Sequence, residues 1–195
     1  MEKLSLLLEK NDENAIKLIN YPATRQSTGD ACGIVCTQTM LEYYGENHRE
    51  DELVKYVRAD QVTMSDDKND ANAEKIIKFF EEEKGFKVDA REMTINDLIS
   101  YIDRDIPVIV MIQAYGDMED YSSEWRSGHY VVAIGYTRNK MLFEDPSSFQ
   151  VGYIPMREFL SRWHDQDEDR RYINYGIAVY GKPPKFDKNK WTRID

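Results

Sequence analysis

The chain has 195 residues, with 26 Lys or Arg against 36 Asp or Glu and a formal net charge of −10 at pH 7. This length suits one domain that can bury its core without disulfides or metals, and the acidic balance argues against nucleic acid, whose binding depends on neutralising phosphates. The longest uninterrupted apolar run, residues 106–112, is too short to span a membrane.

The N-terminal segment carries a leucine cluster. Leucines and isoleucines follow helical spacing over residues 3–20, interrupted at residues 11–14. Glu2, Glu9 and Lys10 break the cluster, so the segment lacks the basic and apolar regions of a secretory signal. The two cysteines lie four positions apart, which is a poor disulfide framework and suits a reducing compartment. We therefore expect helical structure near the N-terminus and a cytoplasmic location.

A polar, turn-prone loop precedes the first cysteine. The stretch QSTGDACG places Gln26 six positions before Cys32, and Cys36, Met40 and Tyr43 follow at helical spacing. We expect Cys32 on the first turn of a helix, where the helix dipole favours a negative sulfur. A free cysteine has a pKa of about 8.5, so a catalytic one needs such a helix start and a neighbouring imidazolium to hold its thiolate. Gln26 and the backbone N–H of Cys32 are candidate donors to an oxyanion.

Helical patterns continue to about residue 102, and strand patterns follow. Helices are expected over residues 51–58, 72–84 and 94–102. Gly85 closes the second, and a capping box of Thr94 with Asp97 opens the third. Strands are expected at residues 106–113, 129–137, 140–145, 150–154 and 173–180, with a helix after Pro155.

The chain contains a histidine and an aspartate in positions suited to assist a thiol. His129 opens an apolar, β-branched run, and a turn leads into a second apolar stretch, so the two predict a β-hairpin. The hairpin returns the chain toward His129, where Asp145 lies next to Pro146. Because proline ends strand pairing, the carboxylate is free to accept from one imidazole nitrogen and fix the tautomer. Cys32, His129 and Asp145 then form a candidate triad for acyl transfer.

These motifs resemble the papain-like cysteine peptidases that remove double-glycine leader peptides from bacteriocin precursors, and in particular their free-standing relatives that are not fused to a transporter. The matching stretches are QSTGDACG, LEYYG (residues 41–45), PVIVMI (residues 107–112), GHYVVAIGY and EDP, across roughly residues 24–165. One departure is Ala31 directly before the cysteine, where transporter-linked members usually have Asp; here the Asp is one position earlier, as Asp30.

The resemblance implies a role for each candidate residue: Cys32 as nucleophile, His129 as base, Asp145 as the orienting residue and Gln26 as oxyanion donor. It also agrees with an α+β, papain-like fold, in which an N-terminal helical layer packs on a C-terminal antiparallel β-sheet with the cleft between them. We expect one peptidase domain over residues 1–181. Residues 182–195 are expected to form an extended C-terminal tail.

Several of these residues also allow simpler interpretations. Cys32 alone would more often be a small buried hydrophobe, and Asp145 could merely cap a turn. Cys36 is expected in the core, His48 at a helix end or in water, and His164 in a charged stretch. A zinc site at the cysteines lacks further ligands of recognisable spacing, so we expect no metal and no cofactor.

Three classes of function remain open at this point. The first is a cysteine peptidase that hydrolyses a peptide or isopeptide bond through an acyl-enzyme thioester. The second is a papain-like acyl transferase or amidase that uses the same triad with an amine or thiol acceptor, as phytochelatin-synthase-like relatives do. The third is a non-catalytic peptide-binding module.

The segment before His129 suggests a preference for peptides of one charge. It carries Asp117, Glu119, Asp120 and Glu124 against a single Arg126. An acidic rim concentrates cationic ligands, so a cationic peptide or protein substrate is expected. The alternative is a solvated loop that only keeps the protein soluble.

Overall fold

The computed structural model describes residues 14–58, 71–114, 121–167, 170–191 and 193. Its elements in chain order are β1 (Lys17–Leu18), α2 (Cys32–Tyr43), α3 (Glu50–Val57), α4 (Ala73–Lys78), the π-helical turn η1 (Phe79–Glu83), β2 (Lys87–Glu92), α5 (Ile95–Asp103), β3 (Val108–Gln113), β4 (Gly128–Tyr136), β5 (Lys140–Glu144), β6 (Gly152–Pro155), α6 (Met156–Arg162), β7 (His164–Asp167), β8 (Arg170–Ile173) and β9 (Tyr175–Tyr180). None of the helices in the described ranges has the length and apolar character needed to cross a bilayer.

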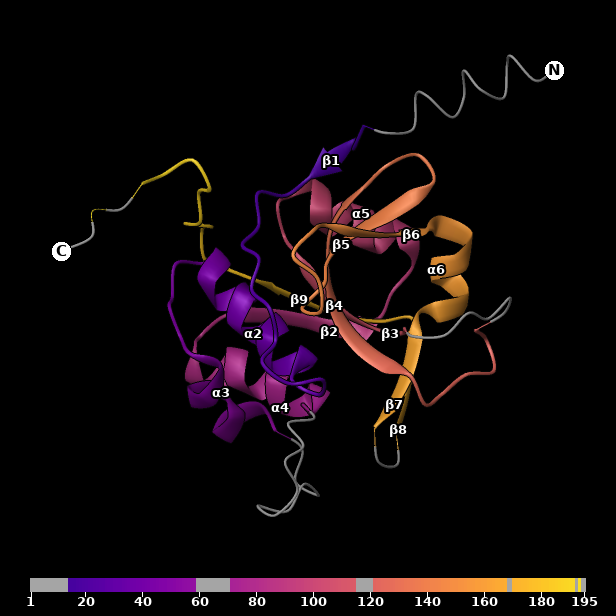
Figure 1. Cartoon of the computed structure of the whole chain (residues 1–195), viewed down its shortest axis with the longest axis horizontal. Helices are drawn as coiled ribbons and strands as arrows, with labels where there is room; N and C mark the ends of the chain where they lie inside the picture. The colour runs from indigo at the N-terminus through magenta and orange to yellow at the C-terminus, as the bar shows by residue number, and fades with distance from the viewer. Residues whose placement is uncertain (1–13, 59–70, 115–120, 168–169, 192, 194–195) are drawn as a thin grey trace.

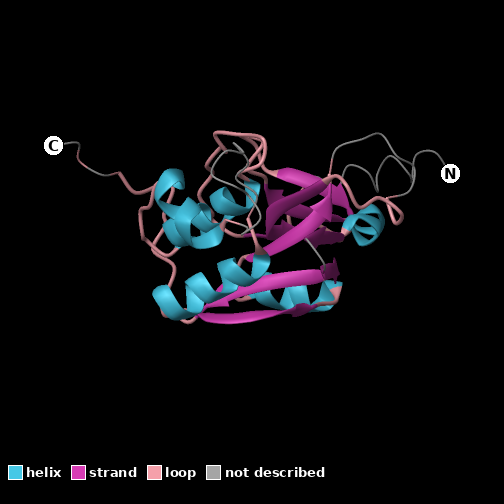
Figure 2. Ribbon diagram, turned by 90° about the horizontal axis from the view of Figure 1, so that it is seen from below, coloured by secondary structure: helices cyan, strands magenta, loops and turns pink. Residues whose placement is uncertain are grey.

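The main sheet is antiparallel throughout and follows the order β2-β9-β3-β4-β5-β6. Every residue of β3 is buried, as are seven consecutive residues of β4, because helices cover both faces of these central strands. Figure 1 shows α2, α3 and α4 on one side of the strands and α6 on the other, and Figure 2 shows the same arrangement after a 90° turn. The strands β7 and β8 form a separate hairpin.

Two neighbouring residues of β5 show how the helices divide between the faces. The ring of Phe143 packs 5.2 Å, centroid to centroid, from Phe159 of α6. The next side chain, Glu144, interacts electrostatically with Cys36 of α2. Since successive strand residues point to opposite faces, α2 and α6 cover opposite sides of the sheet. The expected α+β, papain-like architecture is confirmed.

Most of the expected elements are present within a few residues of their predicted bounds. Thr94 Oγ accepts from the Asp97 N–H at 3.2 Å and the Asp97 carboxylate accepts from the Thr94 N–H at 2.7 Å, as a capping box requires. The helix expected over residues 72–84 is formed by α4 and η1, and it ends at Gly85, whose φ is +66°.

The N-terminal expectation is wrong where the structure describes it, because residues 14–20 contain bends and the short strand β1 and are not helical; residues 1–13 lie outside the described ranges. The first residue of β3, Val108, pairs with Ala133, so the last residues of β4 extend beyond β3. Strand β1 pairs with these residues, and Ile19 N–H donates to the Ile134 carbonyl at 2.8 Å. Sheet hydrogen bonding therefore prevails over the local helical pattern.

The segment after β9 contacts the C-terminal end of α2. The backbone N–H groups of Lys185 and Phe186 donate to the Tyr43 carbonyl at 2.9 and 3.0 Å, and Lys182 pairs with Glu46 at 3.0 Å. These contacts satisfy a carbonyl that a helix end leaves without an intrahelical partner. The division of the chain at residue 181 stays a prediction.

The close passage of β1 over β4 generates a stability prediction. A Cβ on Gly135 would lie 2.6 Å from the Lys17 carbonyl oxygen, a backbone atom that cannot move aside. Gly135→Ala should therefore destabilise the fold by about 1–3 kcal/mol. Gly29→Ala is the matched control, because nothing lies within 4 Å of a Cβ there. Thermal unfolding of both variants checks this, and equal melting temperatures would contradict it.

Candidate active site

Cys32 is the first residue of α2 and is half-buried. Nine of the twelve residues of this helix are buried, so the helix lies in the core and its start is fixed. The N-cap residue, Ala31, has no side chain that can cap the helix. The backbone N–H groups of the first turn place partial positive charge at this end of the helix, where the sulfur lies.

The residue after the cysteine allows α2 to approach β4 closely. A Cβ on Gly33 would lie 2.5 Å from the Cβ of Ala71 and 3.2 Å from the ring of Tyr130. Because glycine has no Cβ, the helix start reaches the first residues of β4. The backbone N–H of Tyr130 then donates to Cys32 Sγ at 3.5 Å. A backbone donor of β4 is thus directed at the sulfur.

His129 joins the cysteine to the aspartate. The residue is 2% exposed, its Nε2 donates to Asp145 Oδ1 at 2.7 Å, and its side chain also hydrogen-bonds with Cys32. Since Nε2 donates to the carboxylate, Nδ1 is the ring nitrogen that is available to hydrogen-bond with the sulfur. Burial disfavours the charged ring, but the hydrogen bonds with Asp145 and Cys32 outweigh this effect and raise the pKa of His129 to about 9.

Asp145 is held as an anion by a turn that the sequence analysis did not identify as functional. Ser147 donates to Asp145 Oδ1 twice, from its backbone N–H at 2.9 Å and from its hydroxyl at 2.7 Å. Burial opposes ionisation, but the hydrogen bonds with His129 and Ser147 outweigh it and lower the pKa of the Asp145 carboxyl to about 2. The signal was present in the stretch DPSS, because an Asp often accepts from the backbone two residues later in a turn.

Gln26 lies in a loop that is attached next to Asp145. Its backbone N–H donates to the Pro146 carbonyl at 2.9 Å, and its side-chain Nε2 donates to the Thr28 carbonyl at 2.7 Å. An amide nitrogen carries two hydrogens, so one remains for another acceptor. The side-chain oxygen, Oε1, is buried without a hydrogen-bond partner.

The remaining cysteine and histidines occupy other places. Cys36 is fully buried in the core, and burial raises the pKa of its thiol well above the usual value. His164 Nε2 lies 2.7 Å from the Glu124 carbonyl oxygen, where it anchors the segment that leads to β4. Both residues therefore have contacts that suit a structural role.

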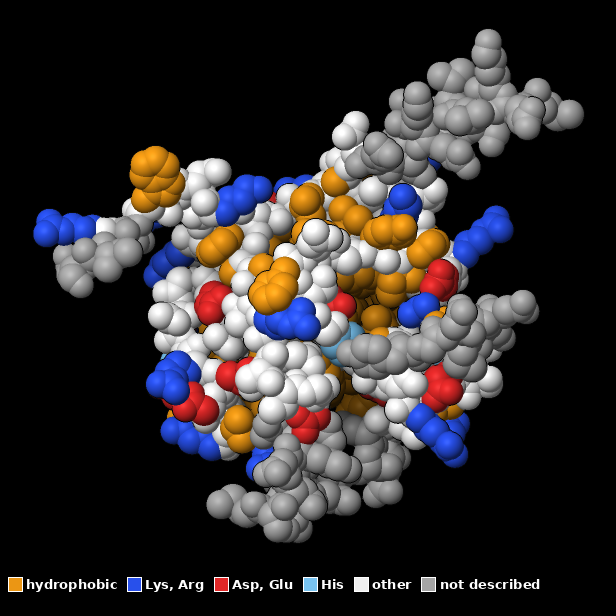
Figure 3. Space-filling model, viewed as in Figure 1, with side chains coloured by type: hydrophobic (Ala, Val, Ile, Leu, Met, Phe, Trp, Pro, Cys, Tyr) orange, Lys and Arg blue, Asp and Glu red, His pale blue; other side chains and the backbone are white. Residues whose placement is uncertain are grey.

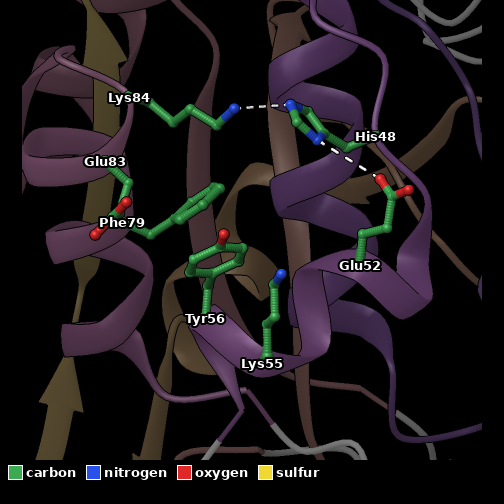
Figure 4. Close-up of a pocket in the computed structure, with 7 residues that line it drawn as sticks. All are labelled: His48, Glu52, Lys55, Tyr56, Phe79, Glu83 and Lys84. Atoms are coloured by element: carbon green, nitrogen blue, oxygen red, sulfur yellow. Dashed lines mark hydrogen bonds and ion pairs between the residues drawn. The ribbon is translucent and has the colours of Figure 1, made fainter.

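His48 lines a cavity of about 280 Å³ between α3 and the α4–η1 helix. Figure 4 shows His48 between Lys84 and Glu52, with Tyr56 and Phe79 nearby. Lys84 Nζ lies 2.7 Å from His48 Nε2 and 2.9 Å from Glu46. The contacts of His48 are thus with this charged cluster. Within the described ranges, no group of three or more His, Cys, Asp or Glu residues is arranged to hold a metal ion.

The fold of the chain resembles the folds of several solved peptidase structures. A C39-like peptidase from Bacillus anthracis matches with a TM-score of 0.65 and 19% identity, over 87% of this chain and 99% of its own. The peptidase domain of Streptococcus ComA, a bifunctional ABC transporter of a quorum-sensing pathway, matches with a TM-score of 0.59 and 20% identity. The match covers 85% of this chain and 98% of that domain.

A double-glycine motif protease of an AMS/PCAT transporter, solved in complex with its leader peptide, matches with a TM-score of 0.54 and 18% identity, over 86% of this chain and 95% of its own. No curated protein matches this chain. The model of the peptidase C39-like family matches residues 18–169, a span that includes the cysteine, the histidine and the aspartate described above. The chain therefore belongs to the peptidase C39-like family and is a cysteine peptidase.

Proposed function

We propose that the chain hydrolyses a peptide or isopeptide bond through a Cys32–His129–Asp145 triad and an acyl-enzyme thioester. The observation that supports this most is the position of His129, which hydrogen-bonds with the sulfur on one side and the carboxylate on the other. A raised pKa of about 9 at His129 favours the imidazolium that stabilises a thiolate.

In the first half of the reaction, the Cys32 thiolate attacks the carbonyl carbon and forms a tetrahedral oxyanion. The backbone N–H of Cys32 and the second amide hydrogen of Gln26 donate to this oxygen. The His129 imidazolium gives its proton to the leaving amine, and the C–N bond breaks to leave a thioester.

In the second half, neutral His129 takes a proton from water, and the resulting hydroxide attacks the thioester. The C–S bond then breaks, which releases the acid and returns the thiolate beside the imidazolium. An amine or thiol in place of water would give acyl transfer by the same steps. Analysis of the products formed with and without added amine or thiol identifies the acceptor.

Exposed apolar side chains in the segment that follows Asp145 support a peptide as the substrate. Phe149 and Val151 follow Asp145 in the chain and are 79% and 47% exposed, and Tyr153 of β6 is 60% exposed. The guanidinium of Arg25, next to Gln26, lies 4.9 Å from the centre of the Phe149 ring. Figure 3 shows hydrophobic side chains gathered in the centre and upper right of the face that is viewed in Figure 1. Such exposed apolar groups are typical of a surface that binds another chain.

The proposal predicts different reactivity at the two cysteines. Iodoacetamide should alkylate Cys32 in the native protein at least about tenfold faster than Cys36, because only Cys32 has a helix start and an imidazolium beside it. Mass spectrometry of the labelled peptides measures both rates. Equal rates, or faster labelling of Cys36, would remove Cys32 from the role of nucleophile.

The charge of Asp145 should control the titration of His129. Because the carboxylate raises the pKa of the imidazole, Asp145→Asn should lower that pKa from about 9 toward the usual 6.5. The imidazolium is then lost at lower pH, and turnover should fall but persist, whereas His129→Ala should abolish it. NMR titration of the ring, with His48→Gln and His164→Gln to assign the three signals, measures the pKa. An unchanged titration in Asp145→Asn would contradict the orienting role.

We also propose that cationic peptides are preferred. Of the four acidic residues that motivate this, Asp117, Glu119 and Asp120 lie outside the described ranges, and Glu124 is described beside Trp125. Lys-rich peptides should show higher kcat/KM than matched Glu-rich peptides at low salt, and the difference should shrink at high salt because ions screen the attraction. Equal values at low salt would exclude steering by this segment.

A further inference from the structure

Glu144 is a buried carboxylate that the proposed chemistry does not use. It directly precedes Asp145, it is 3% exposed, and it faces the α2 side of the sheet, where Tyr21 and Cys36 interact with it electrostatically. Burying an acid beside a second acid costs free energy that an apolar side chain would not.

Glu144 contacts the loop that contains Gln26. The carboxylate accepts a hydrogen bond from the backbone N–H of Thr24, while its Oε1 is buried without a partner. Burial raises the pKa of Glu144 to about 7, the Thr24 N–H opposes this, and the charge of Asp145 adds to it. The Glu144 carboxylate therefore has one hydrogen bond, to the Thr24 backbone, while its Oε1 has none.

Three consecutive residues then connect both halves of the site. Glu144 accepts from Thr24, Asp145 accepts from His129, and the Pro146 carbonyl accepts from the Gln26 N–H at 2.9 Å. Two of these bonds fix the loop on either side of residue 25. The same short segment thus sets the position of the loop and the orientation of the imidazole.

We propose that Glu144 is a positioning residue that holds the Thr24–Gln26 loop so that the Gln26 amide is directed at the oxyanion. This inference rests on the proposed function, because it assigns Glu144 an effect that acts through Gln26. The carboxylate touches neither the substrate nor the reacting atoms.

The test compares two reactions of the same thiol. Acylation by p-nitrophenyl acetate passes through a tetrahedral oxyanion, and its burst of p-nitrophenolate gives the rate. Alkylation by iodoacetamide displaces iodide at a saturated carbon and forms no oxyanion. Glu144→Leu should slow acylation by about 10- to 100-fold, up to the scale of losing one oxyanion donor, and leave alkylation within about twofold.

The conservative variant and a double mutant separate positioning from general damage. Glu144→Gln keeps a carbonyl oxygen for the Thr24 N–H and should restore most of the acylation rate. In a variant that already carries Gln26→Ala, adding Glu144→Leu should slow acylation by less than about threefold further. The amide through which Glu144 acts is already absent there. If Glu144→Leu does not fold, Thr24→Pro removes the donor instead and should show the same selective loss, with Thr24→Ala as its control.

Three results would overturn the inference: equal losses in both reactions, a Glu144→Gln variant as slow as Glu144→Leu, or additive effects with Gln26→Ala. A failure of the proposed function looks different. In that case Cys32→Ala would keep the acylation burst of the unaltered protein, whatever residue stands at position 144.

Discussion

The contact between the first turn of α2 and the first residues of β4 is the constraint on which the site depends. It exists because Gly33 has no Cβ to separate the helix from Ala71 and Tyr130. The helix brings the sulfur, and the strand brings the imidazole and a backbone N–H to the same point. Neither element alone brings both a helix start and an imidazole to the sulfur.

Burial makes the charged form of His129 costly in free energy. A histidine that is 2% exposed would normally lose its proton, so a charged ring at this position requires a compensating anion. Asp145 supplies the negative charge, and Ser147 in turn satisfies Asp145 with two hydrogen bonds. His129 is therefore supported by Asp145 and Asp145 by Ser147, and such mutual support keeps a buried network of charges ordered rather than costly.

The sequence was most informative where local chemistry determines structure. The capping box at Thr94, the glycine after η1 and the proline before α6 mark element ends through their own backbone preferences, and these elements formed close to where they were expected. The spacing of Cys32, His129 and Asp145 could likewise be interpreted because one helix and one hairpin carry all three. The roles assigned to these three residues and to Gln26 stay proposals.

The elements that were missed depend on partners distant in the chain. The strand β2 has the sequence KVDARE, in which only Val88 and Ala90 form an apolar face, and it pairs along its whole length with β9. The strand β1 likewise forms on the end of β4 that β3 leaves without a partner. The support of Asp145 by Ser147 and the burial of Glu144 depend on how loops meet, which residue spacing does not encode.

The attachment of the C-terminal segment to Tyr43 has a consequence for building larger molecules from this chain. Helix α2 has twelve residues, so at about 1.5 Å per residue its two ends lie about 18 Å apart. Cys32 is at one end, and Lys185 and Phe186 bind the other. A domain, label or solid support joined beyond Phe186 would begin its path at the end remote from the sulfur, so the chain can be tethered there while a bulky peptide still has access to the thiol.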